Sequence, residues 1–197
     1  MDILALATMF QMLSCVFANA ARYRRVHNPK ERGTVGELIE VLTGTPKLWQ
    51  YKRTNKTNNN TCLYWQNGTV SLSSDSYSFT EVYWNSTGRQ EHQLQGDLVM
   101  NSRSEDQGSA LQIKGMSEGG FNKEYLLVHW NNSYNCGVFY TEEKDTGGKR
   151  IIQNCGLYFW NKTVTNDDFV KKCQPDYEKY CKVYEKNKTQ QTLYKQD

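Results

Sequence analysis

Apolar and polar side chains alternate with the period of a β-strand through most of the chain from Lys47 to Trp160. Eight such stretches, each rich in β-branched or aromatic residues and bounded by turn residues, are predicted as strands: 47–53, 61–66, 76–84, 90–100, 109–116, 121–130, 135–143 and 151–160. No pattern of helical length interrupts them. Successive strands joined by short turns indicate an antiparallel up-and-down sheet, and eight strands can close into a barrel with room for one small ligand.

A helix is expected on each side of the strands. Thr34 and Glu37 form a capping-box pattern before an apolar run, which predicts a short N-terminal helix that ends near Gly44. Past the last strand and a polar gap, Pro175 suits the first position of a C-terminal helix. One face of that helix would carry four residues at helical spacing, namely Tyr177, Tyr180, Cys181 and Tyr184.

The first 20 residues have the features of a secretory signal peptide. Residues 3–18 are apolar without Lys or Arg, and Ala18-Asn-Ala20 is a small-x-small cleavage site. The apolar run is shorter than a spanning helix of roughly 20 residues, and no similar run follows. We therefore expect a secreted, extracellular protein without a membrane anchor. Its parts are a signal peptide at 1–20, a basic tail at 21–33, one folded domain at 34–185 and a polar tail at 186–197.

The chain carries seven Asn-x-Ser/Thr sequons, which predict a heavily glycosylated protein. Each also marks a surface loop, and the glycine after the sequon residue Asn67 is a turn signal in its own right. The seven acceptors are Asn55, Asn59, Asn67, Asn85, Asn131, Asn161 and Asn187.

Five cysteines remain once Cys15 leaves with the signal peptide, which predicts two disulfides and one free or intermolecular thiol. A bridge from Cys62 to Cys181 would tie an early strand to the last helix and close a long loop. Cys136 would then pair with Cys173 or, across a hairpin, with Cys155, and the sequence leaves both pairings open. Because Cys-x-x-Cys and paired histidines are lacking, we expect no metal site and no cofactor.

Charge and motifs exclude two further classes of protein. The formal net charge of +3 is small and scattered, and the basic cluster before Gly33 is interpreted as a solvated tail, so no nucleic-acid partner is expected. Gly115-Met-Ser117-Glu-Gly119 matches the nucleophile-elbow pattern of hydrolases, which needs a helix after the serine. A glycine and a predicted strand follow instead, so we interpret the match as a hairpin turn and expect no enzyme.

Several segments together resemble tick salivary lipocalins of the histamine-binding protein family, including the japanin-like clade. The resemblance covers nearly the whole mature chain and is carried by a short helix and five segments: Leu48-Trp49-Gln-Tyr51, Cys62, Cys136-Gly-Val-Phe-Tyr140, Leu157-Tyr-Phe-Trp160 and Cys173 to Cys181 with Tyr177 between. The Gly-x-Trp motif of mainstream lipocalins is absent, since Gly44 and Trp49 are five positions apart. The resemblance implies an eight-stranded antiparallel up-and-down lipocalin barrel with a short N-terminal helix and a C-terminal helix.

The resemblance also implies a function. Such proteins capture a small host mediator or lipid in the barrel and so modulate host inflammation or immunity. In amine-binding members acidic side chains hold the ammonium, but Thr54 and Gln95 stand at two of those positions here, which weakens that interpretation. Japanin-like members bind a sterol.

Glu81 is the acidic residue that would restore amine binding. Alternation places it on the same face as Tyr77, Phe79 and Tyr83. If this face points inward, the barrel offers a carboxylate among aromatic rings, which suits histamine or serotonin. If the opposite face with Val82 points inward, Glu81 is solvated, and the sequence leaves both arrangements open.

The remaining pocket candidates are apolar or aromatic, and a dry pocket of this kind favours a sterol or an eicosanoid. An alternative of another class is a filled barrel whose surface binds a host immune-cell protein or acts as an inhibitor, although seven glycans would shield much of that surface. The full set of pocket candidates is Trp49, Tyr51, Phe79, Glu81, Tyr83, Leu94, Leu98, Leu111, Ile113 and Phe139.

Overall fold

The computed structural model describes residues 32–56, 58–101, 107–118, 120–144, 151–185 and 188–195. The predicted signal peptide lies outside these ranges, as does the basic tail up to residue 31. The sequon residue Asn187 also lies outside them. None of the helices within them is long and apolar enough to cross a membrane.

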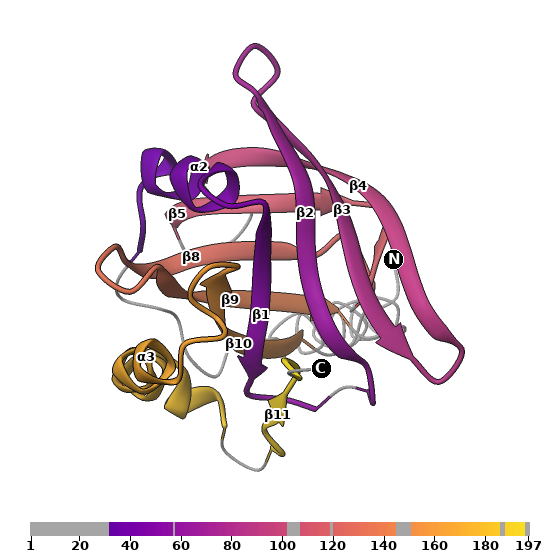
Figure 1. The fold of residues 1–197 in the computed structure, drawn as a ribbon. Helices are drawn as coiled ribbons and strands as arrows, with labels where there is room; N and C mark the ends of the chain where they lie inside the picture. Colours follow the sequence, from indigo (N-terminus) through magenta and orange to yellow (C-terminus); the bar gives the residue numbers. More distant parts are fainter. Residues whose placement is uncertain are drawn as a thin grey trace, which may run out of the picture.

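Eight long antiparallel strands form a closed barrel, as predicted (Figure 1). Each strand pairs with its neighbour along the chain, and the barrel closes where Leu48 to Arg53 of the first strand pair with Gly156 to Trp160 of the last. The strands are β1 (Lys47–Arg53), β2 (Thr61–Ser71), β3 (Ser76–Asn85), β4 (Gly88–Asn101), β5 (Gln107–Lys114), β8 (Glu124–Asn131), β9 (Cys136–Lys144) and β10 (Ile151–Trp160).

The largest differences from the predicted strand ends lie at the end of β2 and between β5 and β8. β2 continues past residue 66 because Asn67, with φ of 56°, sits at an irregularity in its pairing with β3 rather than in a turn. The segment between β5 and β8 forms a separate hairpin of β6 (Met116–Ser117) and β7 (Gly120–Phe121). The prediction had divided this hairpin between its neighbours, since the apolar residues Met116 and Phe121 continue the alternation of the flanking strands.

The helix α2 (Val35–Thr43) covers one end of the barrel. Its capping box forms as expected, with the Thr34 hydroxyl accepting from Glu37 N and the Glu37 carboxylate from Thr34 N. The apolar face of the helix joins the core inside the barrel. Two barrel side chains hydrogen-bond to its last carbonyls: Tyr77 Oη donates to Leu42 O and Trp160 Nε1 to Val41 O, each at 3.0 Å.

The helix α3 (Asp167–Cys181) packs on the outside of the barrel and continues into a 3-10 turn, η1 (Lys182–Tyr184). It starts eight residues before Pro175, so the prediction that the proline opens the helix is wrong. The start is fixed by Asn166, whose side chain accepts hydrogen bonds from Asp168 N and Phe169 N.

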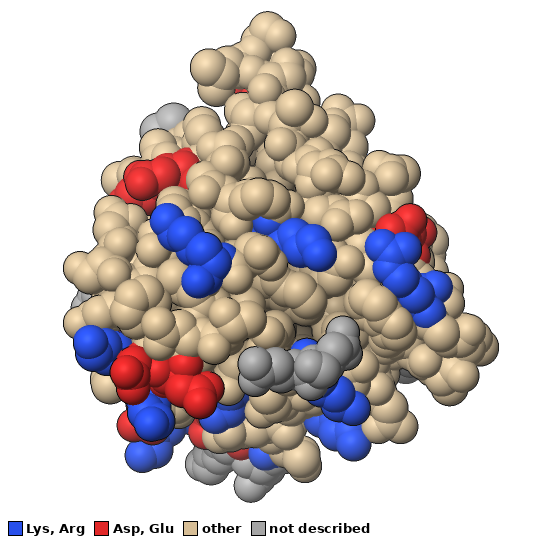
Figure 2. All heavy atoms as spheres, viewed as in Figure 1, with Lys and Arg blue, Asp and Glu red and all other residues tan. Residues whose placement is uncertain are grey.

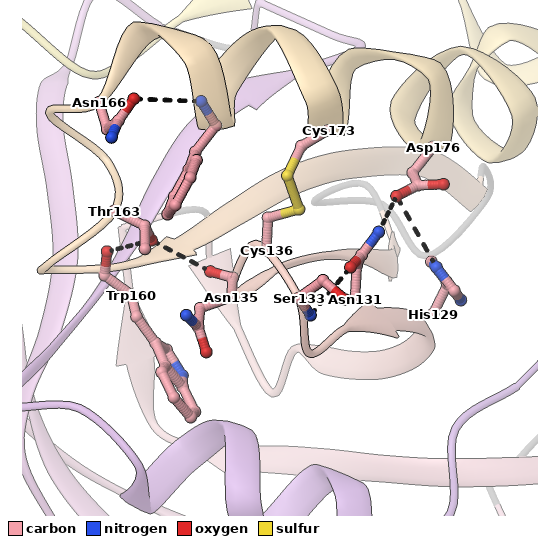
Figure 3. The surroundings of a disulfide bond; sticks show 11 residues. His129, Asn131, Ser133, Asn135, Cys136, Trp160, Thr163, Asn166, Cys173 and Asp176 are labelled. Carbon is pink, nitrogen blue, oxygen red and sulfur yellow. Dashed lines mark hydrogen bonds and ion pairs between the residues drawn. A yellow bond between two sulfur atoms is a disulfide. The ribbon is translucent and has the colours of Figure 1, made fainter.

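Two disulfides attach α3 to the barrel wall, Cys136–Cys173 to β9 and Cys155–Cys181 to β10. Figure 3 shows the first, beside Asp176, which accepts from Asn131 Nδ2 at 3.2 Å. The predicted Cys62–Cys181 bridge is wrong, because Cys181 faces β10 while Cys62 lies on β2 as a free thiol.

Residues 188–195, expected to be a polar tail, include a further short strand, β11 (Gln191–Thr192), paired with the end of β1. On the face shown in Figure 2, acidic and basic side chains are interspersed, with a mixed group at the lower left.

Candidate functional site

Aromatic rings fill the middle of the barrel. Trp65 lies with its ring centroid 4.9 Å from Phe79, 4.8 Å from Tyr125 and 6.1 Å from Tyr158. Phe139 adds a further contact with Tyr158 at 4.9 Å. All five side chains are at most 3 % exposed. Aliphatic residues and α2 complete the apolar core at one end of the barrel. Buried polar groups lie at the opposite end.

A buried polar network occupies this second end, which we call the mouth. Strands β1 and β3, the loop before β2, the β6–β7 hairpin and β11 each contribute to it. Its members, which we call the mouth cluster, are Arg53, Asn58, Asn60, Glu81, Glu118 and Gln191.

Arg53 and Glu118 form a buried ion pair at the centre of the mouth cluster. Arg53 Nη1 lies 3.0 Å from Glu118 Oε2, and both side chains are 2 % exposed. Asn58 Nδ2 and Asn60 Nδ2 also donate to Glu118 Oε1, at 2.7 and 3.0 Å. Burial by itself would raise the pKa of Glu118, but the Arg53 guanidinium, Lys123 and these hydrogen bonds hold that pKa below its ordinary value. The charge of Glu118 is therefore compensated.

Glu81 is the second buried carboxylate, with no exposed surface. Its Oε1 accepts from Trp65 Nε1 at 3.3 Å, and its Oε2 accepts from the backbone N–H of Glu118 at 2.5 Å. Within the described part of the chain, it makes no ion pair with a basic side chain. Burial raises the pKa of Glu81 and outweighs the backbone hydrogen bond from Glu118, which lowers it. The charge of Glu118 adds to the rise, and the Trp65 hydrogen bond and Lys123 oppose it.

Rings and a histidine surround this carboxylate. Tyr83 follows Glu81 on the inner face of β3, and its ring lies 5.5 Å from that of His92 on β4. His92 Nδ1 lies 3.1 Å from Met116 O, and this contact ties β4 to the β6–β7 hairpin. A cation near Glu81 would therefore meet a carboxylate whose neighbours include the indole of Trp65 and the ring of Tyr83 on the same face of β3.

The structure puts most of the predicted pocket residues inside the barrel. Glu81 lies on an inward face of β3, so of the two arrangements left open by the sequence the buried one is present. Buried with it are Phe79, Leu94, Leu98, Leu111, Ile113 and Phe139 in the barrel core, and Tyr83, which packs with Leu63 and Leu193.

Trp49 and Tyr51 lie outside the barrel, so the expectation that they line a cavity is wrong. Alternation in β1 directs Leu48 and Gln50 inward and turns the two rings toward the outer cluster beneath α3. There both contact Tyr194, at centroid distances of 5.2 and 6.0 Å.

Sequence reasoning missed the partners of Glu81. Glu118 was noted only as part of Gly-x-Ser-x-Gly, where Ser117 Oγ in fact donates to Gly120 O within the hairpin. Arg53 points inward because the pairing of β1 with β10 is irregular between Gln50 and Lys52. Of the two positions that the resemblance compared with acids, Thr54 is buried and bonds Asn154 Oδ1 at 2.9 Å, and Gln95 is exposed.

No protein-family model and no curated protein sequence matches the chain. Solved structures do match. Insecticyanin of the tobacco hornworm Manduca sexta aligns with a TM-score of 0.55 at 9 % identity, covering 87 % of each chain. The siderocalin Ex-FABP aligns with a TM-score of 0.51 at 11 % identity, covering 80 % of this chain and 96 % of that one. Apocrustacyanin C1 aligns with a TM-score of 0.50 at 12 % identity, covering 86 % of this chain and 91 % of that one. These similarities show the lipocalin fold.

Proposed function

We propose that the chain is a secreted lipocalin that binds a small amine, with Glu81 holding the ammonium group. The observation that carries this proposal is a carboxylate with no exposed surface and no basic ion-pair partner in the described residues. Burying an unpaired carboxylate is costly, so such a group is retained where a ligand supplies the opposite charge. The nearby aromatic side chains of Trp65 and Tyr83 favour a cation over a neutral ligand.

Binding requires the β6–β7 hairpin to move. Glu118 of this hairpin already donates its backbone N–H to Glu81 Oε2, and its side chain is locked by Arg53. An entering ammonium would replace that N–H as the partner of Glu81. The hairpin then acts as the cover of the site, which excludes water from the bound ligand.

Several features support the extracellular part of the proposal. The two disulfides form in oxidising compartments, which agrees with the signal-peptide pattern. Three sequon residues, Asn59, Asn67 and Asn161, are exposed and accessible to glycans. Together with the resemblance to tick salivary lipocalins, these features favour capture of a host amine such as histamine or serotonin, which would modulate inflammation.

The apolar ligand that the sequence favoured has less support. Leu94, Leu98, Leu111 and Ile113 are buried against the aromatic core and α2, so a sterol or eicosanoid would have to displace packed side chains. A surface-binding immunomodulator needs no such rearrangement, and it remains an outcome of the experiment below.

Titration of the glycosylated protein with histamine and serotonin tests the proposal, with tryptophan fluorescence and native mass spectrometry as readouts. We expect saturable binding that Glu81→Gln removes. Glu91→Gln is the matched control, because Glu91 lies on β4 and is 44 % exposed. Binding of cholesterol or leukotrienes alone would replace the amine by an apolar ligand, and binding of no small molecule would favour the surface-binding function.

A further inference from the structure

The barrel wall has a gap at the mouth between β1 and β2. These strands pair only through Lys47 to Trp49, opposite Tyr64 to Gln66, and diverge toward the mouth. The C-terminal segment enters this gap (Figure 1). On one side Leu193 N donates to Tyr51 O at 2.8 Å, and on the other Leu193 O accepts from Cys62 N at 2.7 Å. The segment thus acts as an additional strand of the wall.

Side chains hold the segment in place as firmly as its backbone. Leu193 has no exposed surface and packs between Leu63 and Tyr83, the latter only two residues from Glu81. Tyr194 covers Trp49 and Tyr51 on the outside. The segment is therefore an integral part of the fold next to the ligand site.

Gln191 joins this strand to the mouth cluster. Its Oε1 accepts from Arg53 Nε at 2.8 Å. Its Nε2 donates to Asn58 O and Asn60 O at 3.1 and 2.8 Å, and these two asparagines bond Glu118. Gln191 is only 8 % exposed, whereas its neighbour Gln190 points to solvent.

We propose that Gln191 is a positioning residue of the ligand site, which holds Arg53 on Glu118 and so keeps Glu81 available to the ligand's cation. The proposal rests on the proposed function for the identity of the ligand. Arg53 and Glu81 both contact Glu118, one through its carboxylate and the other through its backbone N–H. Arg53 Nη2 also donates to Asn58 Oδ1 at 2.8 Å, so loss of the acceptor on Gln191 removes only the constraint on Nε. Without that constraint the guanidinium can shift from Glu118 toward the second carboxylate, where it would compete with an ammonium ligand.

The other charged and titratable groups near Glu81 do not replace this constraint. Lys123 lowers the pKa of Glu81, whereas Glu118 lowers it through its backbone N–H and raises it through its charge. Tyr83 and His92 face it from β3 and β4, and the buried Tyr125 and Tyr158 from β8 and β10. Arg53 differs from these groups because the C-terminal strand holds its guanidinium through Gln191 Oε1.

The test compares Gln191→Met, which keeps the side-chain volume but removes the polar groups, with Gln190→Met as the matched control. We expect histamine or serotonin affinity to fall by about tenfold or more in Gln191→Met, as for a lost hydrogen bond to a charged group. The affinity should be unchanged in Gln190→Met. Gln191→Ala takes the place of Gln191→Met if the latter does not fold.

A ligand-free measurement separates this proposal from the proposed function. Carboxyl-carbon NMR titration of Glu81 should give a lower pKa in Gln191→Met than in the wild type, because Arg53 approaches Glu81. A wild-type protein that binds no amine but shows this change would overturn the amine function and leave the positioning role in place. An unchanged Glu81 titration in a folded Gln191→Met would overturn the positioning role.

Discussion

The carboxylate of Glu81 accepts a hydrogen bond of 2.5 Å from the backbone N–H of Glu118. This contact ties the β6–β7 hairpin, which covers the mouth, to the group that we propose binds the ligand. This hydrogen bond and a bound cation are thus alternatives, because an entering ammonium would take the place of the N–H. Glu118 has Arg53 as its ion-pair partner, whereas Glu81 has only hydrogen-bond donors among the described residues.

Amine binding should depend on pH through Glu81. Burial raises its pKa above the ordinary value, so Glu81 becomes neutral at a higher pH than an exposed glutamate does. We expect affinity for serotonin to fall as the pH is lowered through this raised pKa, because a protonated carboxyl no longer offers a full charge. Fluorescence titrations from about pH 8 to about pH 5 measure this effect, and an affinity that stays constant over that range would contradict it.

The same group should cost stability. A carboxyl whose pKa is raised by folding stabilises the folded state only while it is protonated, and that contribution is lost as the pH rises through the folded-state pKa. Glu81→Gln should therefore raise the free energy of unfolding at neutral pH by about 1 kcal/mol or more while it abolishes amine binding. Urea unfolding measures the change. A destabilised Glu81→Gln would show that Glu81 is a structural rather than a ligand-binding group.

Breaking the Arg53–Glu118 pair should be strongly destabilising. Both side chains are 2 % exposed, so Arg53→Met leaves a buried carboxylate without its cation, and we expect a loss of about 3–5 kcal/mol. Lys114→Met is the control, because its pair with Asp97 is 63 % and 37 % exposed and should contribute at most about 1 kcal/mol. Equal losses in the two variants would contradict the burial of the mouth pair.

The folded-state pKa of Glu118 is lowered, so the contribution of this pair should be present at neutral pH and lost as the pH falls through that pKa. Arg53→Met should therefore show a smaller acid-induced loss of stability than the wild type. Unfolding curves at neutral and acidic pH compare the two proteins, and an identical loss in both would refute this linkage.

Cys62 should be dispensable for stability, whereas the two disulfides are not. Alkylation without reduction should label Cys62 alone among the cysteines of the described residues, as peptide mass mapping will show. Cys62→Ser should change the free energy of unfolding little. Removing Cys155–Cys181 by a double Cys→Ser change should cost about 2–5 kcal/mol, because α3 then loses one of its covalent links to the barrel wall. A mapped Cys62–Cys181 peptide would contradict the observed pairing.

Local patterns were enough to predict the strands and the N-terminal helix. Alternation along β3 put Glu81 on the face of Tyr77 and Phe79, but alternation gives two faces without saying which one is inside. The start of α3 was missed because the cap at Asn166 is a local signal that the proline obscured. The outward placement of Trp49 and Tyr51 was missed because large aromatic rings suit an inner or an outer core equally well.

The sequence by itself determined the eight strands and the presence of a helix before and after them, because periodicity, turn residues and caps act between near neighbours in the chain. Only the tertiary structure decided the disulfide pairing and the composition of the mouth. Cys155 meets Cys181, and Arg53 meets Glu118 and Gln191, across separations of 26, 65 and 138 residues. Such contacts depend on how strands close and where the chain returns, which the local spacing of residues does not record.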